Sequence, residues 1–198
     1  LTADLTIAAN ADALLRENQA DSNFGADITL EVGKVNIGST SSLRYAWVGF
    51  APLSAIPTGS RVTAARLEID LIAATGAGSL PVFVCRGEGG WLERNPGGIT
   101  WNNQPLGTSN TPCVAATIGN VPGLASWDVT PIVVSWIEGG WAQQGFRLSP
   151  DQDVSALRTF RSREHTNPAR PPRLLVSYVP PTLTPTPSAT RTRTPTRT

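Results

Sequence analysis

The segment Arg66-Leu-Glu-Ile-Asp-Leu71 decides the fold class, because polar and apolar residues alternate in it without a break. Successive side chains of an extended strand point to opposite faces, so Leu67, Ile69 and Leu71 share one face. The polar residues between them share the other face. The segment therefore predicts a β-strand with one buried and one solvated side.

Similar short runs of apolar and β-branched residues fill the chain up to residue 179, separated by turn-forming clusters such as Pro57-Thr-Gly-Ser and Asn95-Pro-Gly-Gly. We expect strands near residues 5–9, 28–32, 43–50, 61–72, 80–85, 99–101, 113–118, 125–129, 144–148, 157–160 and 173–178. Some ten to twelve short strands predict an all-β fold, an antiparallel β-sandwich of jelly-roll type.

One short helix is expected after residue 129. Thr130 is the candidate N-cap, and Pro131 suits the first turn. The apolar residues that follow share one helical face, and two glycines end the helix. These residues are Ile132, Val133, Trp136 and Ile137, with Gly139 and Gly140.

The C-terminal segment has a different composition. Residues 180–198 hold eight Thr, five Pro and three Arg. Such a segment buries too little apolar surface to fold alone, and its prolines favour an extended chain, so we expect a stalk or linker. Its threonines suit O-glycosylation, with Thr184, Thr186, Thr190 and Thr194 as candidates.

Charge and composition exclude several functions. The net charge is +1, and since the tail holds three arginines and no acid, residues 1–179 carry −2. A near-neutral body disfavours nucleic acid as a partner. No apolar run approaches the roughly 20 residues of a membrane span. A single His excludes sites that need two, and no paired carboxylates stand out, so we expect no enzyme. Because the chain does not begin with Met, we expect a signal peptide to precede it.

Several segments, in order along the chain, follow the pattern of a known family. They are Ala11-Asp-Ala-Leu-Leu, Asn23-Phe-Gly-Ala, Leu30-Glu-Val-Gly, Val48-Gly-Phe, Leu53-Ser-Ala-Ile-Pro-Thr-Gly-Ser, Ala65-Arg-Leu-Glu-Ile, Trp91-Leu-Glu, Ile99-Thr-Trp-Asn-Asn-Gln-Pro, Trp127-Asp-Val-Thr, Val134-Ser-Trp-Ile-Glu-Gly-Gly, Phe160-Arg-Ser-Arg-Glu-His and Arg170-Pro-Pro-Arg-Leu-Leu-Val-Ser-Tyr.

This ordered set resembles the DNRLRE domain family over residues 8–179. The resemblance implies a secreted or cell-surface β-sandwich with no catalytic residues. It also implies kinship with carbohydrate-binding modules for acidic polysaccharides such as alginate. Residues 1–10, a separate alternating strand, and the stalk at 180–198 lie largely outside it.

Cys85 and Cys113 are the two cysteines of the chain. In a secreted protein an even number of cysteines favours a disulfide, here across a 28-residue interval. The alternative is a pair of buried thiols.

Aromatic and arginine side chains are the candidate carbohydrate ligands. Trp141, which follows two glycines, and Trp91 are candidates for stacking on sugar rings, although Trp more often packs in a core. Arg161 and Arg163 alternate along an expected strand and could together clamp a uronate carboxylate. The alternative is an internal network in which they pair with Glu93, Glu164 or Asp128.

Oxygen ligands for calcium are the last candidate site. Asp151 and Asp153 lie in an expected turn, and calcium is bound by six to eight oxygens, often from loops. Surface turns also use Asp for their own backbone hydrogen bonds. No other cofactor is expected.

The alternating strand at residues 1–10 suggests self-association. Through Leu5 and Ile7 it could add to a sheet edge of a second copy, and repetition of that contact would build a filament. The first hypothesis is therefore a non-catalytic extracellular structural subunit that assembles head to tail through its terminal segments. The second is a carbohydrate-binding module for acidic polysaccharide, tethered by the Thr/Pro linker.

Overall fold

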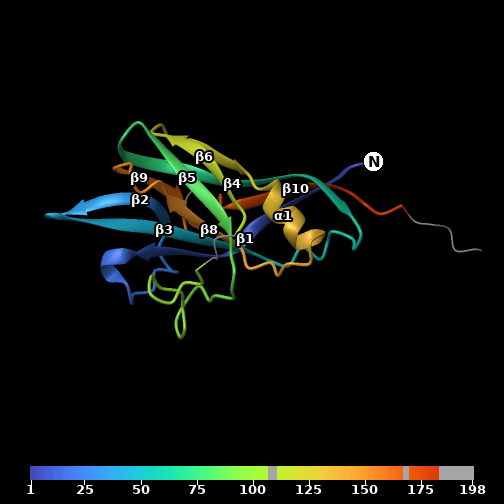
Figure 1. The fold of residues 1–198 in the computed structure, drawn as a ribbon, viewed down its shortest axis with the longest axis horizontal. Helices are drawn as coiled ribbons and strands as arrows, with labels where there is room; N and C mark the ends of the chain where they lie inside the picture. The colour runs from blue at the N-terminus through green and yellow to red at the C-terminus, as the bar shows by residue number, and fades with distance from the viewer. Residues whose placement is uncertain (107–110, 167–169, 183–198) are drawn as a thin grey trace, which may run out of the picture.

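Antiparallel strands dominate the computed structural model, which describes residues 1–106, 111–166 and 170–182. Within these residues it contains ten strands, one 3-10 turn and one α-helix (Figure 1). In chain order they are β1 (Ala3–Arg16), η1 (Glu17–Gln19), β2 (Thr29–Ile37), β3 (Thr40–Phe50), β4 (Arg61–Gly76), β5 (Ser79–Arg86), β6 (Cys113–Gly119), β7 (Gly123–Asp128), α1 (Thr130–Ile137), β8 (Phe146–Pro150), β9 (Ala156–Arg161) and β10 (Arg173–Val179).

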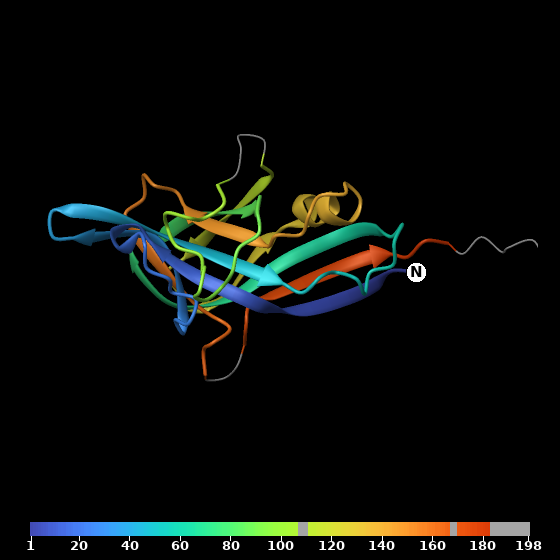
Figure 2. The same ribbon diagram turned by 90° about the horizontal axis from the view of Figure 1, so that it is seen from below.

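Two long strands change partners along their length. The first half of β1 pairs with β10 and its second half with β3, with a register shift between Ala9 and Ala11. Likewise β4 pairs first with β10 and then with β9, with a shift between Leu71 and Ala73. In Figure 2 the blue, red and teal strands β1, β10 and β4 run side by side below the helix.

Because β1 and β4 change partners, the strand layers on the two sides of the core are joined into one sheet. The strands β1, β10, β4, β9, β2 and β3 close a ring, while β8, β5 and β6 extend from β3, and β7 extends from β4. The prediction of an all-β, sandwich-like antiparallel fold is confirmed. The two layers belong to one continuous sheet, because β1 and β4 pass from one layer into the other.

The main core lies between β4, β10 and β7 on one side and β3, β8 and β5 on the other. Leu67, Ile69 and Leu71 are buried, as their alternation predicted. From β7, Trp127 crosses the core and donates from Nε1 to the carbonyl oxygen of Val82, at 3.1 Å. This buried bond ties the two layers together.

A second, smaller core lies on the outer side of β1 and β3. Trp47 is fully buried there beneath the loop that contains Trp91 and Trp101. The predicted strand at 99–101 is wrong. Thr100 and Asn103 instead close a turn, in which the Thr100 amide donates to Asn103 Oδ1 at 2.6 Å and the Asn103 amide donates to Thr100 Oγ1.

The predicted helix is present as α1, with Pro131 in its first turn. Thr130 does not cap it, since the N-cap residue is Val129 and makes no side-chain capping bond. The Thr130 hydroxyl oxygen instead accepts from the Ala65 amide at 2.8 Å, and the hydroxyl donates to Asp128 Oδ1. Thr130 therefore fastens the start of the helix to β4.

The predicted disulfide is confirmed: Cys85 and Cys113 are bonded. They lie opposite each other in the β5–β6 ladder, so the bond joins two neighbouring strands.

The N-terminal strand is not separate from the rest of the fold. Ala3 to Ala8 pair with β10, and the half-buried side chains of Leu5 and Ile7 pack against the main core. The two predicted assembly residues therefore have partners within their own chain. The candidate glycosylation residues Thr184, Thr186, Thr190 and Thr194 lie outside the described residues.

Arg158 of β9 is a charged residue in the core, with no exposed surface. Its guanidinium donates to the carbonyl oxygens of Ile118, Thr75, Leu157 and Ala77, at 2.7 to 3.3 Å. Among the described residues no carboxylate pairs with it. Its contacts join β9 to the end of β6 and to the β4–β5 turn.

We predict that Arg158→Met lowers the free energy of unfolding by about 3 kcal/mol, because buried carbonyl oxygens lose their donor. Urea unfolding followed by tryptophan fluorescence measures the difference. Thr159→Ala, at the neighbouring half-buried position, is the control and should cost less than about 1 kcal/mol. A loss for Arg158→Met no larger than that of the control would show that these contacts contribute little.

Candidate functional site

Trp141 is the exposed tryptophan that the sequence indicated. It follows α1, and 56% of its surface is exposed. The guanidinium of Arg86 lies 3.8 Å from the centre of its ring. Arg86 is itself buried and paired with Glu88 at 2.9 Å, so it fixes the indole while part of the ring stays open to solvent.

Trp91 is held more firmly. It is half-buried, meets Trp47 edge-on at 5.7 Å, and donates from Nε1 to the carbonyl oxygen of Gln144 at 2.9 Å. A side chain at Gly49 would come within 3.2 Å of its ring, so the glycine makes room for it. Trp91 lines a shallow pocket of about 210 Å³. Its contacts are mainly those of a packed residue.

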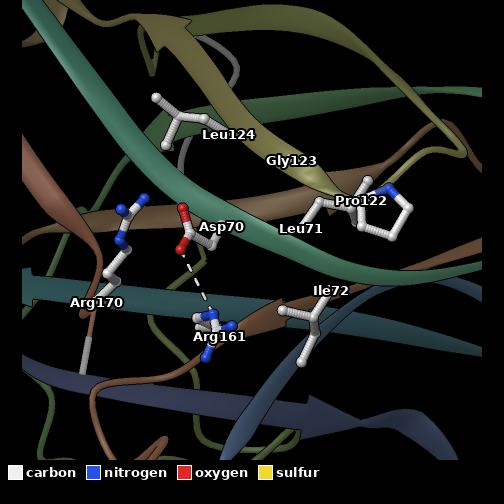
Figure 3. A pocket seen from close by; sticks show the side chains of 8 residues that line it. All are labelled: Asp70, Leu71, Ile72, Pro122, Gly123, Leu124, Arg161 and Arg170. Carbon is white, nitrogen blue, oxygen red and sulfur yellow. Dashed lines mark ion pairs between the residues drawn. The ribbon is translucent and has the colours of Figure 1, made fainter. Parts of the chain in front are cut away.

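A larger pocket, of about 420 Å³, lies on the outer side of β4, β7 and β9 (Figure 3). We call it the basic pocket. It is lined by Asp70, Leu71, Ile72, Pro122, Gly123, Leu124, Arg161 and Arg170. Arg161 and Arg170 approach Asp70 from different elements. The apolar lining side chains make a wall beside these charges.

The two arginines of the basic pocket differ in their partners. Arg161 lies 3.4 Å from Asp70 Oδ2, and its Nη1 lies 2.8 Å from His165 Nδ1. Arg170 is exposed, and no carboxylate among the described residues pairs with it. An anion entering the pocket would therefore meet one guanidinium held by the protein and one available to it.

The structure does not place Arg161 and Arg163 in one clamp. Arg163 turns away from the basic pocket and donates to both oxygens of Glu93, at 3.0 and 2.9 Å, and to Glu164 at 2.8 Å. The strand β9 ends at Arg161, so the strand alternation that predicted a common face does not extend to Arg163. These ion pairs are those of the alternative interpretation, an internal network.

A cluster of three carboxyl groups lies around Arg163, which we call the carboxyl cluster: Asp12, Glu93 and Glu164. Asp12 is only 1% exposed and accepts a bond from the Arg163 amide at 2.7 Å. Burial, with the nearby charges of Glu164 and Glu93, raises the pKa of Asp12 to about 8. At neutral pH the Asp12 carboxyl therefore keeps its proton.

The carboxyl cluster joins three distant parts of the chain. Glu93 also accepts from the Asp12 amide at 2.8 Å, and Arg94 donates to Glu164 at 2.7 Å. The three carboxyl groups lie close enough to contact one cation, but two guanidinium groups already neutralise them. The alternative interpretation of the sequence named Glu93 and Glu164 as partners of the arginines, but no local pattern showed that Asp12 joins them.

Asp151 and Asp153, the predicted calcium ligands, form a turn. The Asp153 amide donates to Asp151 Oδ1 at 3.0 Å, and the Val154 amide donates to the Asp151 carbonyl oxygen. These are the bonds that Asp makes in ordinary surface turns. Calcium binding there stays a prediction.

Comparison with known proteins gives one family match. The model of carbohydrate-binding module family 96 matches residues 3–178, which cover β1 to β10 almost completely. None of the curated proteins compared with the chain matches it. Among the described residues, no helix is long and apolar enough to cross a membrane.

We predict that the protein becomes less stable as the pH rises from about 5 to about 8. The raised pKa of Asp12 means that the folded state keeps a proton that the unfolded chain releases near pH 4, so folding is favoured on the acid side. One such proton changes the free energy of unfolding by about 1.4 kcal/mol per pH unit. Asp12→Asn, which cannot ionise, should remove most of this slope.

Urea unfolding at several pH values tests this, with Asp153→Asn in the exposed turn as the control that keeps the slope. Equal slopes in the wild-type protein and Asp12→Asn would show that Asp12 ionises normally in the folded state.

Proposed function

The chain belongs to carbohydrate-binding module family 96, and from this we propose that it binds acidic polysaccharide, without catalysing a reaction, in the basic pocket. The family match is the observation that carries the proposal. The pocket supplies the chemistry that an acidic glycan requires, and the localisation that follows is extracellular.

The charges of the basic pocket suit a uronate. A guanidinium binds a carboxylate through paired N–H donors, and Arg170 has no carboxylate partner among the described residues. Asp70 holds Arg161 in place and repels an anion that approaches from its own side. The carboxylate of a sugar would therefore be directed toward Arg170.

The apolar wall of the basic pocket suits the sugar ring. Leu124 is 53% exposed, and Ile72 and Pro122 lie beside the same pocket. The C–H faces of a pyranose ring are apolar and would cover this surface while its carboxylate reaches the arginine. Neutral glycans would make the apolar contact alone and bind less well.

The finer interpretations of the sequence stay predictions. The resemblance to the DNRLRE family stays a prediction, and the family model that matches the chain is that of carbohydrate-binding module family 96. The Thr/Pro segment would serve as the tether of the module. Head-to-tail assembly into a filament has no support, and carbohydrate binding is the better-supported of the two hypotheses.

We predict that Arg170→Gln weakens binding of alginate in the basic pocket about tenfold, which corresponds to about 1.4 kcal/mol, because one guanidinium–carboxylate contact is lost. Affinity electrophoresis and calorimetry measure the effect, with a neutral β-glucan as the comparison glycan. Arg61→Gln, at an exposed position at the start of β4, makes the same charge change outside the pocket and should bind alginate normally.

The Trp141→Ala variant tests whether the glycan binds at the exposed indole of Trp141 instead of in the basic pocket. Binding that depends on Trp141 and survives Arg170→Gln would move the site to the end of α1. A wild-type protein that binds neither alginate nor β-glucan would contradict carbohydrate binding itself.

A further inference from the structure

A second surface with the chemistry of a glycan site lies on the opposite layer. It consists of the outward side chains of β3, β8, β5 and β6 that alternate with the main-core residues of those strands, except for Trp47 and Cys85, which are buried. We call it the aromatic face, and its central residues are Tyr45, Phe83, Arg147 and Ser149. None of them lines the basic pocket.

Strand register brings two rings into one row on the aromatic face. Phe83 lies opposite Ser149 of β8 and opposite Ala115 of β6. Since Ala46 lies opposite Leu148, the row continues from Ser149 to Tyr45 on β3. Two strand spacings therefore separate Tyr45 from Phe83, about 10 Å, with the small, buried side chain of Ser149 between them.

The rings are fixed and accessible. Phe83 is 38% exposed in the middle of a paired strand. Tyr45 is half-buried and packs against Trp101, with 4.7 Å between ring centres, while Gln152 donates to its hydroxyl at 3.1 Å. Rigid rings stack on sugars at low entropic cost, and an extended glycan chain can reach both rings along the row.

One positive charge lies beside this row. Arg147 is the only charged residue among the outward side chains of β3, β8, β5 and β6, all of which are described. Its guanidinium carbon is 5.8 Å from the Tyr45 ring centre, and no carboxylate among the described residues pairs with it. An unpaired guanidinium on a neutral aromatic surface favours a ligand that has both apolar rings and anionic groups.

We infer that the aromatic face is a second binding site for an extended acidic polysaccharide, with Tyr45 and Phe83 stacking on sugar rings and Arg147 binding a carboxylate between them. The inference rests on the proposed function for the class of ligand. It goes further in stating that one molecule binds two polysaccharide segments. The core separates the two sites, because Trp127 of β7 and Val82 of β5 meet across it. A module with sites on opposite layers cross-links chains.

The experiment compares binding stoichiometry and cross-linking. Calorimetry with a defined oligoguluronate should give two sites for the wild-type protein, and in Arg170→Gln one site should keep its affinity while the other weakens about tenfold. A variant that combines Arg170→Gln with Phe83→Ala and Arg147→Gln should lose at least 90% of the remaining affinity. The wild-type protein should raise the turbidity of dilute alginate, and variants with one intact site should bind alginate without raising it.

Matched controls exclude general effects of the substitutions. Val121→Ala truncates an exposed apolar side chain on the β6–β7 turn, and Arg61→Gln removes an exposed charge elsewhere. Both should leave stoichiometry and turbidity unchanged. Thermal unfolding confirms that every variant is folded, which is expected because Phe83 and Arg147 point away from the core.

Three outcomes would overturn the second site. One is a single site in the wild-type protein that Arg170→Gln weakens, which leaves the proposed function intact. Another is a site of unreduced affinity in Arg170→Gln that keeps this affinity after both substitutions on the aromatic face. The third is a wild-type protein that binds no polysaccharide, in which case the proposed function fails as well.

Discussion

The bulges in β1 and β4 are the constraint on which the rest of the structure depends. Each long strand must change partners for the ring to close, and each does so at a register shift, at Ala9–Ala11 and at Leu71–Ala73. A bulge re-aims the side chains beside it. Asp12 of the carboxyl cluster follows the first bulge, and Asp70 of the basic pocket precedes the second. The backbone irregularities that close the fold therefore also position its polar sites.

Pairing decides which arginines can bind a ligand. Most arginines of the described chain hold a carboxylate of the protein, as Arg163 holds Glu93, and Arg158 is enclosed by carbonyl oxygens in the core. Arg61, Arg66, Arg147 and Arg170 belong to neither group, and of these Arg147 and Arg170 lie beside the apolar surfaces that we propose a sugar ring covers. A near-neutral protein can recognise a polyanion in this way, because local unpaired donors matter more at contact distance than net charge.

The sequence predicted the features that depend on neighbouring residues. Alternation identified the buried side of β4, and the two cysteines and the exposed Trp141 were recognised from composition and position. It gave the pairing of Arg163 with Glu93 or Glu164 as an alternative, but it did not place Asp12 beside them, because these residues meet only after the loops have folded. The row from Tyr45 to Phe83 was missed for the same reason, since it requires β8 to lie between β3 and β5. The strand predicted at 99–101 is absent, because the apolar residues of this segment pack as a turn over Trp47.

The slightly acidic body has a consequence for how a polyanion binds. Residues 1–179 carry −2, so the folded body, which holds both proposed sites, gives no long-range attraction to an acidic glycan. Binding must then come from short contacts, a guanidinium with a carboxylate and a ring with a ring, and only the first of these is weakened by salt. Affinity should accordingly fall less steeply with ionic strength than that of proteins that neutralise many phosphates. Weak sites of this kind gain most from acting together on one polymer, because a second contact on the same chain is intramolecular. A short oligosaccharide cannot reach two sites on opposite layers, so it shows no such gain in affinity. On a network of polysaccharide chains the gain returns, because each module can hold two chains at once.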